Sequence, residues 1–156
     1  MTRTMLPGEP LSPAQSNAQG HLNEIAALYE LARTARSYMT WSDDQEALSV
    51  EAIGVLGELP WNVDDGLDAL QDAITQHCYD KCLAIREHGY RQPGDSWNVT
   101  HTEIHLTFGG PSCWVRDEVD DTVEIWYSQM GMQPTWLPTT EYEQEALDWF
   151  ASLVSC

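Results

Sequence analysis

The chain has 156 residues, a formal net charge of −18, 42% hydrophobic residues and seven tryptophans. This length suits one domain with a proper core, and the aromatic content argues against a disordered chain. The acidity excludes general binding to nucleic-acid phosphates. No run reaches the roughly 20 apolar residues of a membrane span, and the N-terminal residues lack the apolar core of a signal peptide. We therefore expect a cytoplasmic protein with reduced cysteines.

Residues 16–82 are predicted to be mainly helical. Residues 1–15 contain three prolines and favour an irregular leader, although Ser12-Pro13 can cap a short turn. Leu22–Met39 has apolar residues at helical spacing together with alanines that favour a helix, so we expect the first clear helix there.

Two further helices are expected before the sheet. Residues 42–45 (SDDQ) have the form of a capping box, and Gly57 is a natural stop after Leu56. The third helix is expected to begin near Asp64, with Asn62 or Asp64 as its cap. Its predicted buried stripe consists of Leu67, Leu70, Ile74, Cys78 and Cys82.

Residues 83–137 are predicted to form an antiparallel sheet. Leu83–His88 fits either the last turns of the third helix or the first strand, and the glycines and proline that follow it favour the strand. Ile104, Leu106 and Phe108 alternate with polar residues, which indicates a strand with one buried face.

A three-strand meander is expected from this strand onward. Residues 109–111 (GGP) predict a tight reversal. Cys113–Arg116 and Val123–Tyr127 are the next two predicted strands, joined by a polar turn at Asp120-Asp121. Met130–Pro134 is expected to be a turn or a bulged edge.

The last helix is predicted over residues 140–155, because Thr140 and Glu143 have capping-box spacing. Its predicted apolar face consists of Tyr142, Ala146, Trp149, Phe150 and Leu153. The sequence therefore predicts one α+β domain over residues 1–156, with N-terminal helices, an antiparallel β-meander and a C-terminal helix packed on the sheet.

Part of the predicted sheet resembles a known pattern. Leu106–Pro111 (LTFGGP), a short strand that ends at Val115-Arg116 and the aromatic strand Ile125–Tyr127 are similar to small acidic proteins encoded on phages and plasmids. The resemblance covers residues 83–137. It implies a mobile-element setting, but those proteins have no settled activity, so it implies no mechanism and no catalytic residue.

Four residues raise the question of zinc, namely Cys78 and Cys82 with His101 and His105. Two cysteines one helical turn apart can share a metal. His101 and His105 on one strand lie about 13 Å apart, which is too far to share an ion. We therefore expect both cysteines to face the core and both histidines to lie on the solvent face of the sheet, with no metal and no cofactor.

No constellation in the sequence indicates catalysis. Cys113 lies inside a short strand with no helix N-terminus beside it, so a buried thiol is expected. The GGP turn lacks the spaced glycines and the lysine of a P-loop. Asp117–Asp121 lacks EF-hand spacing and is expected to be a solvated hairpin. We expect no catalytic residue, and a small enzyme is the least favoured of three hypotheses.

The acidic residues are concentrated in two blocks. Residues 41–80 hold ten and residues 117–156 hold nine, with no lysine or arginine in either block. Such blocks attract basic protein surfaces. Trp114 and Trp126 alternate away from the apolar faces of their strands, and they mark a contact patch if both are exposed. The predicted partner-binding residues are Asp64, Asp65, Asp68, Asp72, Trp114, Asp117, Glu118, Asp120, Asp121 and Trp126.

We expect a basic protein partner, with neither direct nucleic-acid binding nor a membrane. The first hypothesis is an inhibitor encoded by a mobile element, of the anti-CRISPR or anti-restriction type, that blocks a basic nucleic-acid-binding surface of a host defence protein. The second is an immunity or antitoxin-like protein that neutralises a basic toxin. The sequence fits both.

Overall fold

The computed structural model describes residues 12–37, 45–57, 66–108, 111–118, 122–130 and 132–155. Over these ranges the chain forms four helices and a five-stranded antiparallel sheet, which confirms the expected α+β fold. The elements in chain order are α1 (Pro13–Ser37), α2 (Gln45–Leu56), α3 (Gly66–Lys81), β1 (Ala84–Tyr90), β2 (Asn98–Thr107), β3 (Ser112–Glu118), β4 (Val123–Ser128), β5 (Thr135–Trp136) and α4 (Glu141–Val154).

The strands form a meander in which each strand pairs with its neighbours along the chain, in the order β1-β2-β3-β4-β5. The predicted strands after residue 83 are confirmed, including the preference for a strand at Leu83–His88. The two-residue strand β5 was not predicted. It forms because Trp136 pairs with Trp126 of β4.

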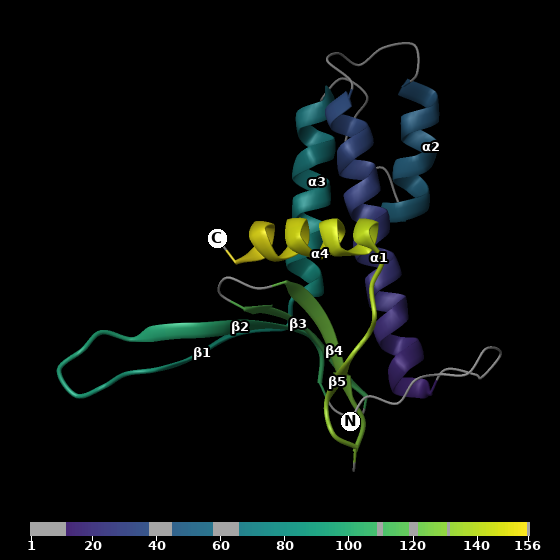
Figure 1. The fold of residues 1–156 in the computed structure, drawn as a ribbon. Helices are drawn as coiled ribbons and strands as arrows, with labels where there is room; N and C mark the ends of the chain where they lie inside the picture. Colours follow the sequence, from purple (N-terminus) through teal and green to yellow (C-terminus); the bar gives the residue numbers. More distant parts are fainter. Residues whose placement is uncertain are drawn as a thin grey trace.

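The hairpin of β1 and β2 projects away from the rest of the molecule (Figure 1). We call β1, β2 and the connecting residues 91–97 the arm. Most residues of β1 are exposed, which fits a strand beyond the cover of the helices. Gly89 lies at a bulge in this strand, and a side chain there would meet the Asn98 carbonyl oxygen at 2.0 Å.

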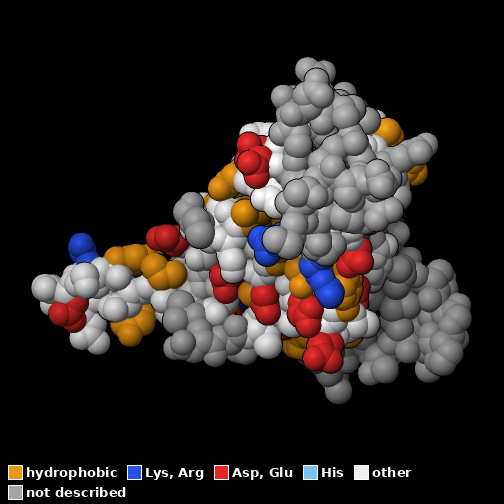
Figure 2. All heavy atoms as spheres, turned by 90° about the horizontal axis from the view of Figure 1, so that it is seen from above, with side chains coloured by type: hydrophobic (Ala, Val, Ile, Leu, Met, Phe, Trp, Pro, Cys, Tyr) orange, Lys and Arg blue, Asp and Glu red, His pale blue; other side chains and the backbone are white. Residues whose placement is uncertain are grey.

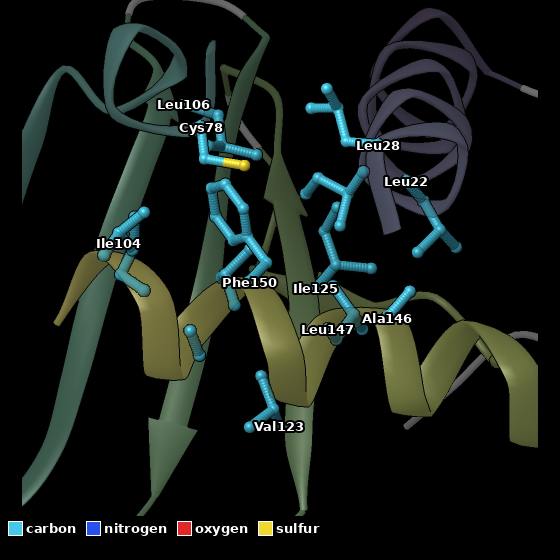
Figure 3. Close-up of a cluster of buried hydrophobic side chains, with 14 of the residues drawn as sticks. Leu22, Leu28, Cys78, Ile104, Leu106, Val123, Ile125, Ala146, Leu147 and Phe150 are labelled. Atoms are coloured by element: carbon cyan, nitrogen blue, oxygen red, sulfur yellow. The ribbon is translucent and has the colours of Figure 1, made fainter. Parts of the chain in front are cut away.

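The hydrophobic core lies between one face of the sheet and the helices α1, α3 and α4 (Figure 1). Ile104, Val115 and Ile125 supply the strand side of this core and are fully buried. Phe150 of α4 is also fully buried, and Figure 3 shows its ring pointing toward Cys78 of α3. Each large apolar side chain buried in this way stabilises the fold by about 1.5–3 kcal/mol.

Helix α1 begins inside the segment that was predicted to be an irregular leader. The Ser12 hydroxyl accepts a hydrogen bond from the Gln15 amide at 3.2 Å, so Ser12 caps the helix and Pro13 is its first residue. The start predicted at Leu22 is wrong, because the buried residues Ala14 and Ala18 continue the same apolar stripe backwards. Neither this helix of 25 residues nor another helix in the described ranges has the length and apolarity needed to cross a membrane.

The C-terminal end of α2 follows the prediction, since Gly57 adopts a positive φ of 83° directly after Leu56. The caps predicted for α2 and α3 lie at residues 42–44 and 62–64, outside the described residues. Helix α3 ends at Lys81, one residue before the predicted end of its stripe, and Cys82 is half-buried.

The capping box of α4 is confirmed. The Thr140 hydroxyl accepts a hydrogen bond from the Glu143 amide at 3.2 Å, and the Glu143 carboxylate accepts one from the Thr140 amide at 2.9 Å. The buried side of α4 is shifted from the prediction, because Tyr142 is only partly buried. The buried residues are Ala146, Leu147, Phe150, Ala151 and Val154.

Two tyrosines join α1 to α4. The Tyr29 hydroxyl donates a hydrogen bond to Glu145 at 3.2 Å, and the Tyr142 hydroxyl donates one to Glu30. The Tyr29 ring also lies against the rings of Tyr142 and Trp149, with centroids 5.5 and 5.6 Å away. Burial and the Glu30 carboxylate together raise the pKa of Tyr142 to about 12, so this hydroxyl stays a hydrogen-bond donor.

Candidate functional site

The candidate site lies on the face of the sheet that points away from the core, which we call the outer face. Strand residues alternate between the two faces, so the neighbours of the buried aliphatic residues point outward. The strand pairing places these outward side chains opposite one another, as with His88 and His101, or Trp114 and Trp126. The outer face consists of Arg86, His88, His101, Glu103, His105, Trp114, Arg116, Glu118, Glu124, Trp126 and Trp136.

A row of rings crosses the outer face, and we call Phe108, His105, Trp114, Trp126 and Trp136 the aromatic row. Successive ring centroids along it lie 4.9, 5.7, 6.4 and 5.2 Å apart. Arg116 lies over the ring of Trp126, and Arg86 lies over that of Phe108, each at 5.2 Å. These distances suit stacking and cation–π attraction, so side-chain contacts run without a break across the outer face from β2 to β5.

The aromatic row corrects two predictions. Phe108 was expected in the core with Leu106, but it is exposed and stacks on His105, because a bulge between His105 and Thr107 shifts the alternation of β2. Trp114 does point to the outer face as predicted, yet it is only 9% exposed, since it lies between His105 and Trp126.

Several buried polar atoms on the outer face have no hydrogen-bond partner among the described residues. They are His105 Nδ1, Trp114 Nε1, Arg116 Nε and Trp126 Nε1. Such atoms are rare in folded proteins and cost about 1–3 kcal/mol each when they are left unsatisfied. In the described ranges, only one other buried side-chain nitrogen or oxygen atom lacks a hydrogen-bond partner, namely His21 Nδ1 in α1. The unsatisfied atoms are therefore concentrated on the outer face.

Glu103 lies among three histidines, and we call His88, His101, Glu103 and His105 the histidine–glutamate cluster. Oε1 of Glu103 lies 3.0 Å from His105 Nε2 and 3.1 Å from His88 Nε2. Oε2 lies 3.5 Å from His101 Nε2. The rings of His88 and His101 are parallel, with centroids 4.5 Å apart. The cluster thus gathers side chains from both strands of the arm.

The pKa of Glu103 reports on this cluster. Burial by itself raises this pKa, but the hydrogen bonds and the positive charge of His105 and His88 outweigh burial, so the pKa lies below its ordinary value. The carboxylate is therefore ionised over the physiological pH range. Both His101 and His105 lie on the outer face as expected, but His105 is not solvated, because it is only 8% exposed between Phe108 and Trp114 in the aromatic row.

The cysteines lie with the core, away from the outer face. Cys78 and Cys113 are buried and Cys82 is half-buried, and in the described part of the chain none of them forms a disulfide. Burial raises the pKa of Cys78 and Cys113 to about 12 and that of Cys82 to about 11. Because thiolates are the nucleophiles and metal ligands, these thiols are poorly suited to either role. The cysteines and the histidines considered for zinc lie on opposite sides of the sheet.

The predicted acidic contact residues do not share one surface. Asp68, Asp72 and Asp80 are exposed and repeat along one side of α3 over about 18 Å. Asp117 and Glu118 point to opposite faces of β3. Burial and then the nearby Asp148 raise the pKa of Asp117, whereas Glu118 forms an ion pair with Arg116 at 2.6 Å. Four of the predicted residues lie outside the described ranges, namely Asp64, Asp65, Asp120 and Asp121.

The arm carries exposed apolar side chains that the sequence-based prediction did not include. Ile85, Tyr90 and Trp97 are 46%, 56% and 51% exposed. Figure 2 shows hydrophobic side chains on the surface of the projecting arm. The packing within this two-stranded hairpin does not bury these side chains, so the arm has an exposed apolar surface.

His88 was missed because its role depends on strand pairing. The signal that identifies it is the turn at Pro93-Gly94, since a hairpin centred there pairs residues at similar distances on each side and places His88 opposite His101.

The chain matches no protein-family model, no curated protein and no solved structure in the comparisons made with it.

Proposed function

We propose that this chain is a cytoplasmic binding protein, not an enzyme, that covers a basic nucleic-acid-binding surface of a partner protein and so inhibits it. The outer face and the arm are its contact surface. The observation that carries the proposal is the exposed apolar surface of the arm, where the side chains of Ile85, Tyr90 and Trp97 are about half exposed. A bound protein removes such surface from water and so stabilises the complex.

The residue types on this surface fit a protein interface. Tyrosine, tryptophan and arginine are enriched at the energetically important positions of interfaces. Trp126 with Arg116 stacked on it supplies one such anchor, and the exposed Tyr90 and Trp97 on the arm supply two more. This surface lies on the nearly neutral part of the chain, residues 81–116, and on the strands next to it.

The charge of the molecule sets the sign of the partner. With a net charge of −18, the protein attracts a basic surface from a distance. The exposed acids of α3 belong to the helical layer, so in this proposal they act through the long-range field and not as contacts. Charge on α3 should therefore govern the association rate, while the aromatic anchors govern the lifetime of the complex.

The resemblance to proteins of phages and plasmids supports a host defence protein as the partner, of the kind that anti-CRISPR or anti-restriction inhibitors target. An immunity-type protein that neutralises a basic toxin can use the same surfaces. Competition separates the two, because only the first partner loses bound nucleic acid when this chain binds.

The test uses a basic defence protein that is captured with the full chain from host cells and then purified. Stopped-flow kinetics are measured at about 0.05 and 0.2 M salt. Replacing both Asp68 and Asp72 by lysine should slow association several-fold at low salt and leave dissociation unchanged. Trp97→Ala or Trp126→Ala should speed dissociation on the order of 30-fold, as expected for an anchor worth about 2 kcal/mol.

Val50→Ala is the matched control, since Val50 is exposed on α2, away from the contact surface. It should change neither rate. The melting temperature of each variant shows that folding is intact, which matters most for the partly buried Trp126. The proposal fails if neither tryptophan variant changes dissociation, or if the partner keeps its nucleic acid when it is saturated with this chain.

A further inference from the structure

The histidine–glutamate cluster brings two imidazoles and a carboxylate together from two neighbouring strands. His88 of β1 pairs with His101 of β2 across the arm, and Glu103 follows on the same face of β2. One ligand atom from each of these three residues lies within 4.8 Å of the other two. The sequence predicted no metal because His101 and His105 are too far apart along one strand. The pairing replaces His105 with His88 from the neighbouring strand.

Thr100 bears on the tautomer of the neutral His101 ring. Its hydroxyl donates its single hydrogen to the His88 carbonyl oxygen at 3.1 Å. The contact of 3.3 Å between this hydroxyl and His101 Nδ1 therefore requires Nδ1 to be the donor. In the neutral His101 ring, the lone pair of Nε2 then faces Oε2 of Glu103 at 3.5 Å. A proton on Nε2 or a metal ion between the two atoms makes this contact favourable, and a metal ion would take the place of that proton.

The distances fit a small divalent ion. A tetrahedral zinc ion binds nitrogen and oxygen at about 2.0–2.2 Å, so its ligand atoms lie roughly 3.3–3.6 Å from one another. Oε1 of Glu103 lies 3.1 Å from His88 Nε2, and Oε2 lies 3.5 Å from His101 Nε2. One carboxylate oxygen thus faces each imidazole, and the two stacked rings have to turn toward an ion that they share. Two imidazoles and one carboxylate favour zinc, cobalt or nickel over calcium or magnesium, which prefer oxygen ligands.

We propose that His88, His101 and Glu103 bind a divalent transition-metal ion, with zinc as the reference ion, on the outer face of the arm. His105 positions the site, because its Nε2 lies 3.0 Å from Oε1 of Glu103 and holds the carboxylate in place. Thr100 plays the same part for His101. The side chain of His88 is 45% exposed, so a water molecule or a group from a binding partner can complete the coordination.

The test is calorimetric titration of Zn²⁺ into the metal-free full-length chain, together with Co²⁺ absorption spectra as a direct report on the ligands. One ion should bind per chain. His88→Ala and His101→Ala should each lower the affinity by about 100-fold or more, and His105→Ala or Thr100→Val by about 10–100-fold, as found for residues that orient ligands. Affinity should fall as the pH is lowered from about 7.5 to 5.5, because protons compete for the imidazoles.

His77→Ala is the matched control, since His77 lies on α3, away from the cluster. It should leave the Zn²⁺ affinity unchanged. His88 is exposed enough for its replacement to leave the fold intact, which the melting temperature in chelator verifies. The proposal is overturned if Zn²⁺ shows no saturable binding below about 1 mM, a free energy of about 4 kcal/mol. It is equally overturned if His88→Ala binds Zn²⁺ as tightly as the unaltered chain, or if His77→Ala or Cys82→Ser weakens binding as much as His88→Ala does.

Discussion

Single residues on the outer face make contacts between strands that their neighbours in sequence do not indicate. Glu103 is ionised beside His88 and His105, so one carboxylate helps to hold the two strands of the arm together. Its pKa is lowered in the folded state, which links the stability of the protein to pH through this residue.

Replacing Glu103 by Gln in metal-free buffer should make stability less dependent on acid. Above the unfolded-state pKa of 4.5, the carboxylate contributes its full share of stability, and that share is lost as the pH falls through the lower pKa of the folded state. The unaltered chain should be more stable than Glu103→Gln by about 1.5–3 kcal/mol near pH 6, as for hydrogen bonds to a charged group. This advantage should shrink steadily as the pH falls below 4.5.

Urea unfolding at several pH values measures the difference. Glu87→Gln is the control, since Glu87 lies on β1 next to His88 but points to the opposite face. It should show no comparable pH-dependent difference. A constant gap between the unaltered chain and Glu103→Gln from pH 6 to pH 3 would contradict the prediction.

Residue identities alone predict part of this site. The outward direction of Trp114 and Trp126 follows from strict alternation in β3 and β4, and the buried state of Cys113 follows in the same way. The position of Phe108 does not follow, because a bulge has no clear mark in the sequence. The closeness of His88 to His101 depends on the register of the hairpin, which acts between strands and not along one.

Among the elements, α4 and the strands β3 and β4 were predicted most closely. Local signals determine them, namely the capping box at Thr140 and the alternation of Val123, Ile125 and Tyr127. The start of α1 was predicted nine residues too late, because the small residues Ala14 and Ala18 look weakly apolar until their partners in the core are known. Short β5 forms only because β4 is there to pair with it.

The arm offers a test at this scale. Gly89→Ala should disrupt the arm, since the added methyl group would meet the Asn98 carbonyl oxygen, and the two strands would have to move apart. We expect a loss of about 1–3 kcal/mol, the usual cost of overpacking. Hydrogen exchange measures this effect. Compared with the unaltered chain, Gly89→Ala should speed the exchange of amides in β1 and the first half of β2 more than that of amides in β3 and β4.

Gly20→Ala is the matched control for that experiment. Gly20 lies inside α1, and apart from the neighbouring residues and backbone of the helix itself, no atom lies within 4 Å of an added methyl group. Alanine should therefore stabilise the helix by about 0.5–1 kcal/mol. If Gly89→Ala leaves exchange in the arm unchanged, the close contact with Asn98 does not exist in solution.

Taken as a whole, the molecule combines an ordinary core with a strongly acidic charge. The net charge was evident from the composition, but its effect on binding depends on where the acidic residues lie in the fold. The exposed acidic residues of α3 lie in a different layer from the outer face. Like charges on a compact body repel one another and destabilise it.

Raising the salt concentration should therefore stabilise the protein. Between about 0.01 and 0.15 M salt, the screening length falls from about 30 to 8 Å. The melting temperature should rise, by about 2–4 °C for each 1 kcal/mol of repulsion that is removed. Replacing Asp68 and Asp72 by lysine should reduce this salt effect. A melting temperature that stays flat or falls with salt would mean that the acids are already compensated locally.

The tyrosine contacts between α1 and α4 also bear on how the chain folds as it is synthesised. The Tyr29–Glu145 and Tyr142–Glu30 bonds join residues 116 and 112 positions apart, whereas every strand pairs with a neighbour along the chain. On the ribosome, the meander can form hairpin by hairpin, but the part of the apolar side of α1 that packs on α4 stays exposed until α4 emerges. We expect nascent chains that stop before residue 141 to expose that side and to bind chaperones, and their release to coincide with the arrival of α4.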